Sequence, residues 1–290
     1  MVVMEPLTYD TAPIGEAVGP VTYKIPLDYN RRRLASYSLP ESAFLPDSGF
    51  AEPSLLCGQH SWVMRKRFSW EGSVHAKCDI AFLKPLRLGA LIHVSCRLSG
   101  KYERRGGRYV VFTLETHDDA GDLICSVDNS MLLNFREVIE ARRKSGSAAR
   151  PQAAPPVSDQ PAVRLLFGVK LLRHEDILDF FGAEESVYGP HPSLHNHKDI
   201  AQAAGLADII APGRYSIGLM NCMFTRFYGE SWLSGARYSV TFLQNLLPGL
   251  RLQVEAAVSG DANTDGFGVA SMDQVSNRAV LSGRASLKLA

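Results

Sequence analysis

The sequence predicts an α+β protein made of two halves, each an antiparallel sheet wrapped around one central helix. Three observations predict this fold. The 290-residue chain changes composition near its midpoint, segments on both sides of the midpoint share one pattern, and each half has an apolar helix candidate followed by long alternating stretches. We expect an N-terminal domain at 1–137, a linker at 138–162 and a C-terminal domain at 163–290.

The linker is predicted from composition. Between residues 137 and 163 the chain reads EVIEARRKSGSAARPQAAPPVSDQPAV, in which Ser, Ala, Pro and Gln replace apolar residues. Polar, Pro-rich segments of this kind behave as extended spacers. The linker therefore divides the chain into two nearly equal units.

The two units also share a sequence pattern. AFLKPLRLGALIHVSCRL from Ala81 aligns with TFLQNLLPGLRLQVEAAV from Thr241, an offset of 160 residues, and Gly58 in PSLLCGQHSWVM corresponds to Gly213 in DIIAPGRYSIGLM. Further along, YVVFTLETHDDAGDLICSVDNSMLL and FGVASMDQVSNRAVLSGRASLKL each predict two strands joined by a polar turn, DDAGD or QVSNR. KYERRGGRY predicts a further hairpin with a Gly-Gly turn.

The helix candidate of the second half is apolar on all sides. In SIGLMNCMF only Asn221 is polar, which is typical of a buried helix rather than an amphipathic surface helix. We expect Tyr215, Ser216 and Asn221 to pack and form hydrogen bonds, and Arg214 to face solvent.

Composition disfavours several classes of protein. Lys and Arg number 31 against 30 Asp and Glu, without a long basic tract between aromatics, so we expect no nucleic-acid partner. No segment approaches the roughly 20 apolar residues of a membrane span, and no signal peptide is seen. The five cysteines form no C-x-x-C pair, which predicts buried thiols in a reducing compartment, and we place the protein in the cytoplasm.

Candidate functional residues concentrate in HPSLHNHKDIAQAAGLADIIAPG, from His191 to Gly213. The stretch holds three histidines, His191, His195 and His197, but their spacing is not that of the usual zinc motifs. We therefore expect neither a metal nor a cofactor here, and favour a catalytic loop with one histidine singled out.

These residues carry a resemblance to a known family. The strand pattern F-L-x-x-[LV]-x-x-G after a glycine-capped helix resembles the hotdog fold, and two such halves resemble the double-hotdog MaoC-like dehydratases, or (R)-specific enoyl-CoA hydratases. The family motif is Asp-x-Asn-Pro-x-His, followed by Ala at plus six, Gly at plus ten and Ile-Ala-x-Gly. Counting from His195, Ala201, Gly205 and the IAPG that ends at Gly213 match it. The first half matches only in strand pattern, which implies a diverged, non-catalytic N-terminal hotdog.

The chain departs from the family pattern ahead of His195. Pro190 and Pro192 stand where the family has its aspartate and asparagine. Four residues nearby are candidates to replace the missing acid: Glu184, Glu185, Tyr188 and His191.

The resemblance implies a lyase of fatty acid metabolism that hydrates enoyl thioesters or dehydrates (3R)-hydroxyacyl thioesters of CoA or acyl carrier protein. His195 would be the base and the Gly213 backbone N–H the oxyanion donor, with Asn196 or His191 holding the imidazole or the water.

Two alternatives remain. One is a catalytically altered hotdog that binds acyl thioesters as a partner subunit. The other is a thioesterase, which GRYSIGLMNCMF disfavours because it lacks a carboxylate. The basic clusters NRRRL and MRKRF are expected to be solvated, or else to steer CoA or a carrier protein. Whether two chains form a homodimer is left open.

Overall fold

The structure is a computed structural model that describes residues 4–70, 73–144, 164–258 and 266–288. It has the predicted α+β architecture. Its main feature is a sheet of ten antiparallel strands in the order β2-β5-β6-β7-β4-β9-β12-β11-β10-β8. The N-terminal half supplies β2 (Ala17–Lys24), β5 (Leu91–Arg104), β6 (Gly107–Asp118), β7 (Leu123–Leu132) and β4 (Val74–Phe82). The C-terminal half supplies β9 (Ala236–Phe242), β12 (Arg278–Leu287), β11 (Gly266–Asp273), β10 (Arg251–Val258) and β8 (Arg164–Leu171).

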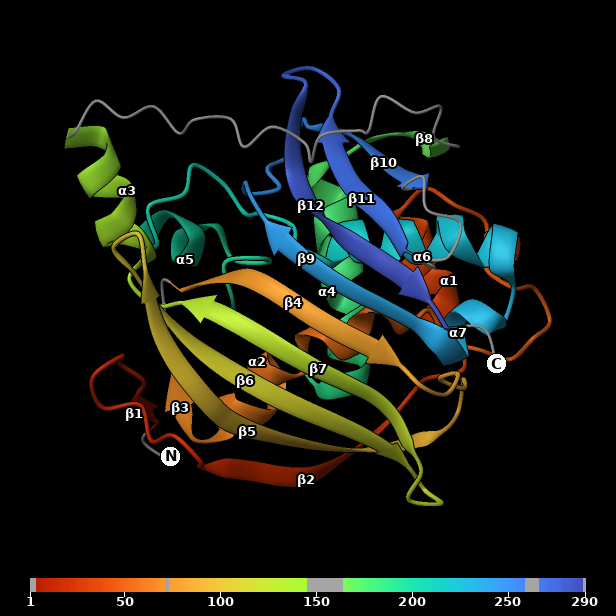
Figure 1. The fold of residues 1–290 in the computed structure, drawn as a ribbon, viewed down its shortest axis with the longest axis horizontal. Coiled ribbons are helices and arrows are strands. Elements are labelled where there is room, and N and C mark those ends of the chain that lie inside the picture. Colours follow the sequence, from red (N-terminus) through yellow and green to blue (C-terminus); the bar gives the residue numbers. More distant parts are fainter. Residues whose placement is uncertain (1–3, 71–72, 145–163, 259–265, 289–290) are drawn as a thin grey trace.

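The two half-sheets join edge to edge through β4 and β9, which lie side by side in Figure 1. Asp79 pairs with Ser239 at the centre of this contact. These two positions differ by 160, the offset at which the two halves align in sequence. Each strand of the first half therefore has a counterpart at the same distance from the centre, which confirms the duplication.

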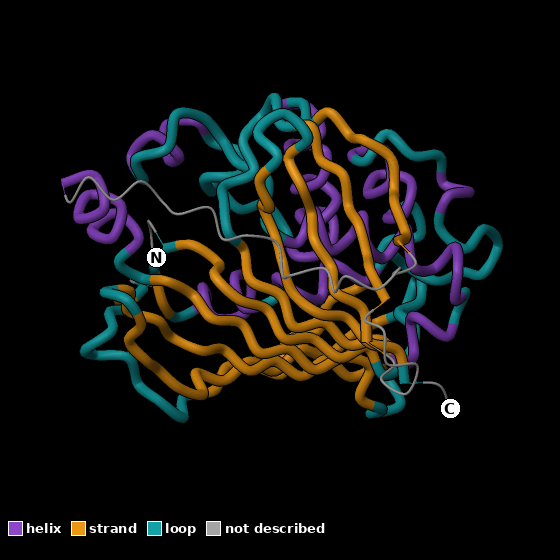
Figure 2. The backbone as a smooth tube through the Cα atoms, turned by 45° about the horizontal axis from the view of Figure 1, so that its top comes forward, coloured by secondary structure: helices purple, strands orange, loops and turns teal. Residues whose placement is uncertain are grey.

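The helices gather on one side of this curved sheet (Figure 2). The central helix of the C-terminal half is α6 (Arg214–Tyr228), and it is followed by the short α7 (Ser231–Gly235). Three further helices precede it or pack beside it: α1 (Tyr29–Ser36), α4 (His174–Tyr188) and α5 (Lys198–Ala203). The N-terminal half also contains a two-stranded parallel sheet of β1 (Glu5–Pro6) and β3 (Phe68–Ser69) and a 3-10 turn, η1 (Glu41–Ala43).

The N-terminal half does not contain the single helix expected around Gly58. The segment is instead divided into the 3-10 helix η2 (Pro53–Gly58), one turn of α-helix α2 (His60–Val63) and the 3-10 helix η3 (Met64–Lys66). A Cβ at Gly58 would lie 2.6 Å from the guanidinium carbon of Arg214, so any side chain here would displace that arginine. The two halves thus interlock at this glycine.

Helix α6 is buried as predicted. Residues Arg214 to Thr225 are all buried, and the three residues expected to pack and form hydrogen bonds do so; Ser216 bonds the Ser271 hydroxyl at 3.1 Å. Tyr215 donates its hydroxyl hydrogen to the Ser36 carbonyl oxygen at 2.7 Å, and Asn221 donates to Glu52 at 2.8 Å. Gly218 faces the Tyr37 hydroxyl so closely that a Cβ would overlap it.

The predicted turns are confirmed, with one shift of register. β6 and β7 are joined across DDAGD, and β11 and β12 across QVSNR. In the hairpin of β5 and β6 the turn residues are Arg105 and Gly106, with φ of 52° and 75°, while Gly107 already belongs to β6. Positive φ at both positions fits a tight two-residue hairpin turn.

The predicted linker begins as a helix. Helix α3 (Phe135–Lys144) covers the first residues of the 138–162 segment, and the remainder of that segment lies outside the described residues. All five cysteines are buried and free: Cys57, Cys78, Cys96, Cys125 and Cys222.

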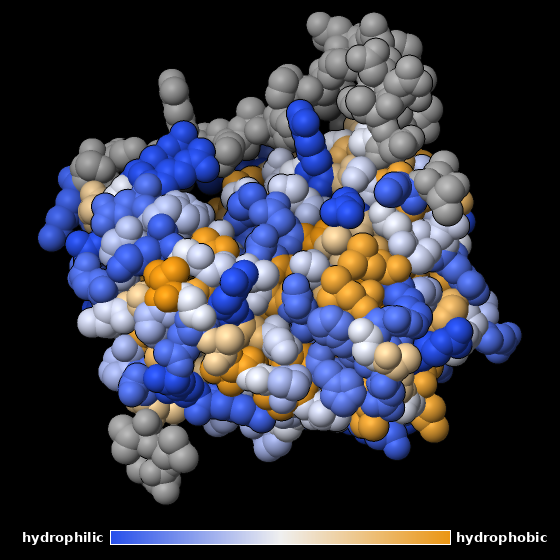
Figure 3. All heavy atoms as spheres, turned by 60° about the horizontal axis from the view of Figure 1, so that its bottom comes forward, coloured by the Kyte–Doolittle hydropathy of each residue, from blue (hydrophilic) through white to orange (hydrophobic). Residues whose placement is uncertain are grey.

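The face of the molecule in Figure 3 carries hydrophilic residues over most of its area, with apolar residues in separate groups between them. Among the described residues, no helix has the length and apolar character needed to cross a membrane.

Candidate active site

A cavity lies between the two halves and contains about 840 Å³ of empty space, including the part open to solvent. The N-terminal half contributes the wall from α2, η3 and the start of β4. The C-terminal half contributes the loop before α5, the start of α6 and the residues after β9. Its polar lining includes His60, His75, His191, Ser193, His195 and Arg214.

His195 lies in the loop between α4 and α5. Its Nδ1 is 2.7 Å from the carbonyl oxygen of Ile210. A carbonyl oxygen only accepts, so Nδ1 carries the hydrogen and Nε2 is left as the basic nitrogen. Burial, assisted by the nearby positive charge of Arg214, lowers the pKa of His195 to about 3. The imidazole is therefore neutral at physiological pH and available as a base.

Gly213 directly precedes α6 and lines the same cavity. Within the described part of the chain its backbone N–H has no acceptor. The N–H stands at the positive end of the helix dipole, where an anionic oxygen is stabilised. A Cβ at this position would overlap the Phe242 ring, so the close packing of Phe242 requires glycine. Because Ile210 and Gly213 belong to one short segment, the orientation of His195 is tied to the position of the free N–H.

The two residues expected to hold the imidazole or the water have other contacts. Asn196 accepts from the Ser193 N–H at 2.8 Å and donates to Glu185 Oε1 and to the His191 carbonyl oxygen, both at 3.1 Å. It therefore fixes the shape of the loop, while the Ile210 carbonyl orients His195. His191 lines the cavity, and its Nε2 accepts from Arg65. Burial, together with the charge of Arg65, lowers the pKa of His191 to about 4.

Neither glutamate proposed to replace the missing acid, Glu184 or Glu185, lines the cavity. Glu185 accepts from the His191 N–H at 2.8 Å. The half-buried Tyr188 stacks on Trp62 with ring centroids 5.2 Å apart and does not line the cavity. Glu184 is fully buried in ion pairs with Arg33 and Arg214. Among the described residues that line the cavity there is no Asp or Glu.

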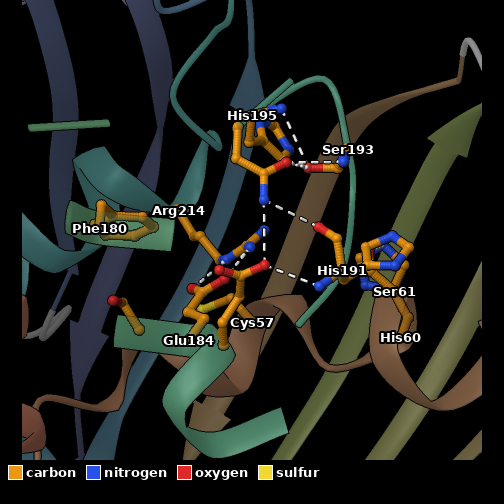
Figure 4. A network of polar contacts seen from close by, with 12 residues as sticks. Cys57, His60, Ser61, Phe180, Glu184, His191, Ser193, His195 and Arg214 are labelled. Atoms are coloured by element: carbon orange, nitrogen blue, oxygen red, sulfur yellow. Dashed lines mark hydrogen bonds and ion pairs between the residues drawn. The ribbon is translucent and has the colours of Figure 1, made fainter. Parts of the chain in front are cut away.

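The expectation that Arg214 faces solvent is wrong. Only 5% of this residue is exposed, and it forms a two-point ion pair with Glu184, with Nε 2.6 Å from Oε1. Arg33, also expected on a solvated surface as part of NRRRL, is fully buried and bonds the same carboxylate at 2.9 Å. Figure 4 shows the loop of His191, Ser193 and His195 running past the pair of Arg214 and Glu184. Burying both guanidinium groups is possible because acidic partners compensate their charge.

Two cavity-lining histidines were missed from the sequence, His60 and His75. Both belong to the N-terminal half, and both are linked by hydrogen bonds to the buried Asn129. The sequence did contain a signal that His60 could lie near the site: it stands two residues after Gly58, which corresponds to Gly213. His75 had no such signal.

The three histidines of the opening stretch have separate partners. His195 bonds the Ile210 carbonyl, His191 bonds Arg65, and the exposed His197 bonds Asn196 at 2.8 Å. Within the described ranges, no three His, Cys, Asp or Glu residues are grouped so that they could hold a metal ion.

No protein-family model matches the sequence, and no curated protein matches it. Solved structures do match in fold. The peroxisomal multifunctional enzyme type 2 of Drosophila melanogaster superposes with a TM-score of 0.70 at 13% identity, over 94% of this chain and 48% of that one. The chain thus corresponds to about half of that enzyme's length. A MaoC-like dehydratase from Phytophthora capsici gives a TM-score of 0.70 at 13% identity and covers 98% of both chains.

A third similar structure is described as having a double hotdog fold. It is a conserved protein of Mycobacterium tuberculosis with a double hotdog fold, with a TM-score of 0.58 and 14% identity over 98% of this chain and 99% of that one. At these identities the similarity concerns the fold. Together with the paired half-sheets and the buried α6, it shows that the chain has the double hotdog fold of MaoC-like dehydratases.

Proposed function

We propose that the protein hydrates enoyl thioesters and, in reverse, dehydrates 3-hydroxyacyl thioesters, carried by CoA or acyl carrier protein. One observation carries the proposal. A neutral histidine with its basic Nε2 unpaired among the described residues and a helix-starting N–H without an acceptor share one cavity, joined through the segment from Ile210 to Gly213. The similarity in fold to dehydratases supports the same reaction.

In this reaction the thioester oxygen accepts the Gly213 N–H, which stabilises the negative charge that develops as water adds to carbon 3. His195 Nε2 takes one proton from the water, and the oxygen forms its bond to carbon 3. The enolate then takes that proton from the imidazolium at carbon 2. Water is consumed, no proton is left on the protein, and dehydration follows the same steps in reverse.

A single imidazole is sufficient for this proton transfer, which matters because no carboxylate of the described residues lines the cavity. The environment that lowers the pKa of His195 to about 3 weakens Nε2 as a base toward water and makes the protonated imidazole correspondingly more acidic. That property suits the return of the proton to carbon 2. In this proposal no residue replaces the family aspartate at Pro190.

The test compares His195→Ala with His197→Ala, a matched control from the same loop whose side chain is exposed. With crotonyl-CoA and longer trans-2-enoyl-CoAs, the loss of enoyl absorbance reports hydration. We expect His195→Ala to lower kcat by about 100-fold or more and His197→Ala to change it less than about twofold. Full turnover in His195→Ala would refute the proposed role.

The missing acid also supports a second candidate, an acyl-thioester binding subunit without its own turnover. Calorimetric titration with acyl-CoAs distinguishes the two. Tight binding by a wild-type protein that turns over no enoyl-CoA would establish the second candidate.

A further inference from the structure

His75, at the start of β4, brings an oriented hydrogen-bond acceptor to the cavity from the half expected to be non-catalytic. Its Nε2 lies 2.7 Å from Asn129 Oδ1 and 3.0 Å from the Lys77 carbonyl oxygen. The Lys77 carbonyl can only accept, so Nε2 carries the hydrogen and Nδ1 has the free lone pair. No described residue forms a hydrogen bond with Nδ1. This atom is also not among the fully buried polar atoms that lack a partner, so a ligand or water in the cavity can reach it.

The orientation of His75 is held by buried neighbours. Asn129 is fully buried, and its Nδ2 donates to the Cys57 carbonyl oxygen at 2.7 Å and to His60 Nδ1 at 2.9 Å. The Cys57 carbonyl fixes which end of the amide is nitrogen, so Oδ1 must face His75. His75, Asn129 and His60 therefore form one chain of hydrogen bonds, in which His75 Nε2 donates to Asn129 and Asn129 Nδ2 donates to His60.

The surroundings of His75 also keep its ring in the neutral form. Burial, with a contribution from the positive charge of Arg214, lowers the pKa of His75 to about 3. The ring stays neutral at physiological pH, so Nδ1 remains an acceptor.

The position of His75 relates it to the acyl part of a bound thioester. Its ring packs on Phe242 with centroids 4.7 Å apart, and the ring of Phe242 also lies against Gly213. One aromatic ring thus separates His75 from the proposed oxyanion donor. In the proposal made below, the acyl chain of a thioester held at Gly213 enters this part of the cavity and passes His75.

A fixed acceptor on a cavity wall discriminates between ligands. A plain alkyl chain would remove water from Nδ1 and supply no donor in its place, which carries the cost of an unpaired buried polar atom. A site built to bond a hydroxyl rejects the analogue that lacks it.

We propose that His75 Nδ1 accepts a hydrogen bond from a hydroxyl group on the acyl chain, so that the preferred substrates are thioesters of hydroxylated acyl groups. This inference rests on the proposed function for the placement of the thioester, and it assigns the N-terminal half a part in substrate selection. His75 is a specificity-determining residue in this account and takes no part in proton transfer.

The test is a calorimetric comparison of hexanoyl-CoA with 4-, 5- and 6-hydroxyhexanoyl-CoA, using wild type, His75→Phe and His75→Gln. The Phe variant keeps a ring of similar size and lacks the acceptor. In the Gln variant the amide nitrogen can donate to Asn129 and Lys77, which leaves the amide oxygen as an acceptor in the cavity. Near-UV circular dichroism establishes that each variant is folded.

We expect wild type to bind at least one hydroxylated ligand about tenfold more tightly than hexanoyl-CoA. The preference should fall to about twofold or less in His75→Phe and return in part in His75→Gln. Equal affinities in wild type, or the same loss in both variants, would overturn the inference.

The two proposals fail separately. A hydroxyl preference without hydration by wild type would refute the proposed reaction and leave the role of His75 intact. Hydration that depends on His195, without a preference for hydroxylated ligands, would support the proposed reaction and refute the role of His75. A lower kcat in His75→Phe without any change of ligand preference would show that Nδ1 bonds water, and would also overturn the inference.

Discussion

Replacing Arg33 by Met removes one of two guanidinium groups from a buried cluster of four charges that joins the two halves. Arg33 and Glu52 come from the N-terminal half, and Glu184 and Arg214 from the C-terminal half. The side chain of Arg33 is 0% exposed. It lies 2.9 Å from Glu184 and 3.3 Å from Glu52, donates to the Phe180 carbonyl at 3.1 Å, and stacks on the Phe180 ring at 3.5 Å.

The magnitude follows from the charge left behind. The four charges of the cluster cancel, so Arg33→Met leaves a net negative charge in the interior. Breaking a buried ion pair in this way costs about 3–5 kcal/mol in the free energy of unfolding. The entropy of unfolding of a 290-residue chain is about 0.6 kcal/mol per kelvin. The expected fall in melting temperature is therefore about 5–8 °C.

The assay is thermal unfolding followed by circular dichroism, with urea unfolding as a second measure. Arg32→Met is the matched control from the same helix, because the Arg32 side chain is 53% exposed and its ion-pair partner among the described residues is Asp28 at the surface. We expect it to shift the melting temperature by no more than about 1 °C. Equal shifts in the two variants would refute the argument that the buried cluster links the halves.

Two further predictions concern packing and pH. Gly218→Ala should destabilise the protein by about 1–3 kcal/mol in urea unfolding because its Cβ meets the Tyr37 hydroxyl, whereas Gly182→Ala, also in a helix but with open space, should stabilise it by about 0.5–1 kcal/mol. A loss of stability in both variants would contradict this reading. For pH, His75 and His195 have pKa values of about 3, so below about pH 6.5 the unfolded chain binds protons that the folded chain does not. Stability should fall between pH 7 and 5.5 by up to about 1.4 kcal/mol per pH unit for each histidine, and His75→Phe should reduce that slope; an unchanged slope would show that His75 is not a buried neutral group.

Much of the fold could be predicted from sequence because alternation and turns are local signals. DDAGD and QVSNR mark their turns through Gly, Asp and Asn, and the offset of 160 residues predicts which strands correspond. The divided helix around Gly58 was not predicted. Its apolar pattern is that of a helix, and the interruption occurs where the backbone packs against Arg214, a contact between segments far apart in sequence.

The candidate site was predicted only on one side. The resemblance to the family motif from His195 to Gly213 indicated both residues, and the structure places them in one cavity. The Ile210 carbonyl that orients His195 leaves no mark in sequence, since every residue has a carbonyl. Arg214 and Arg33 were expected in solvent because charged residues usually are, and only the fold reveals the carboxylates that compensate them.

The pairing of β4 with β9 makes one polypeptide out of two similar units, and this removes a constraint that a symmetric dimer would impose. In a homodimer every substitution appears on both sides of the twofold axis, so each subunit must serve both purposes at once. Here a change on one wall of the cavity is not copied to the other. The C-terminal wall can keep His195 and Gly213, the groups proposed to act in the reaction, while the N-terminal wall varies at His75, where new ligand preferences could be selected without altering those two residues.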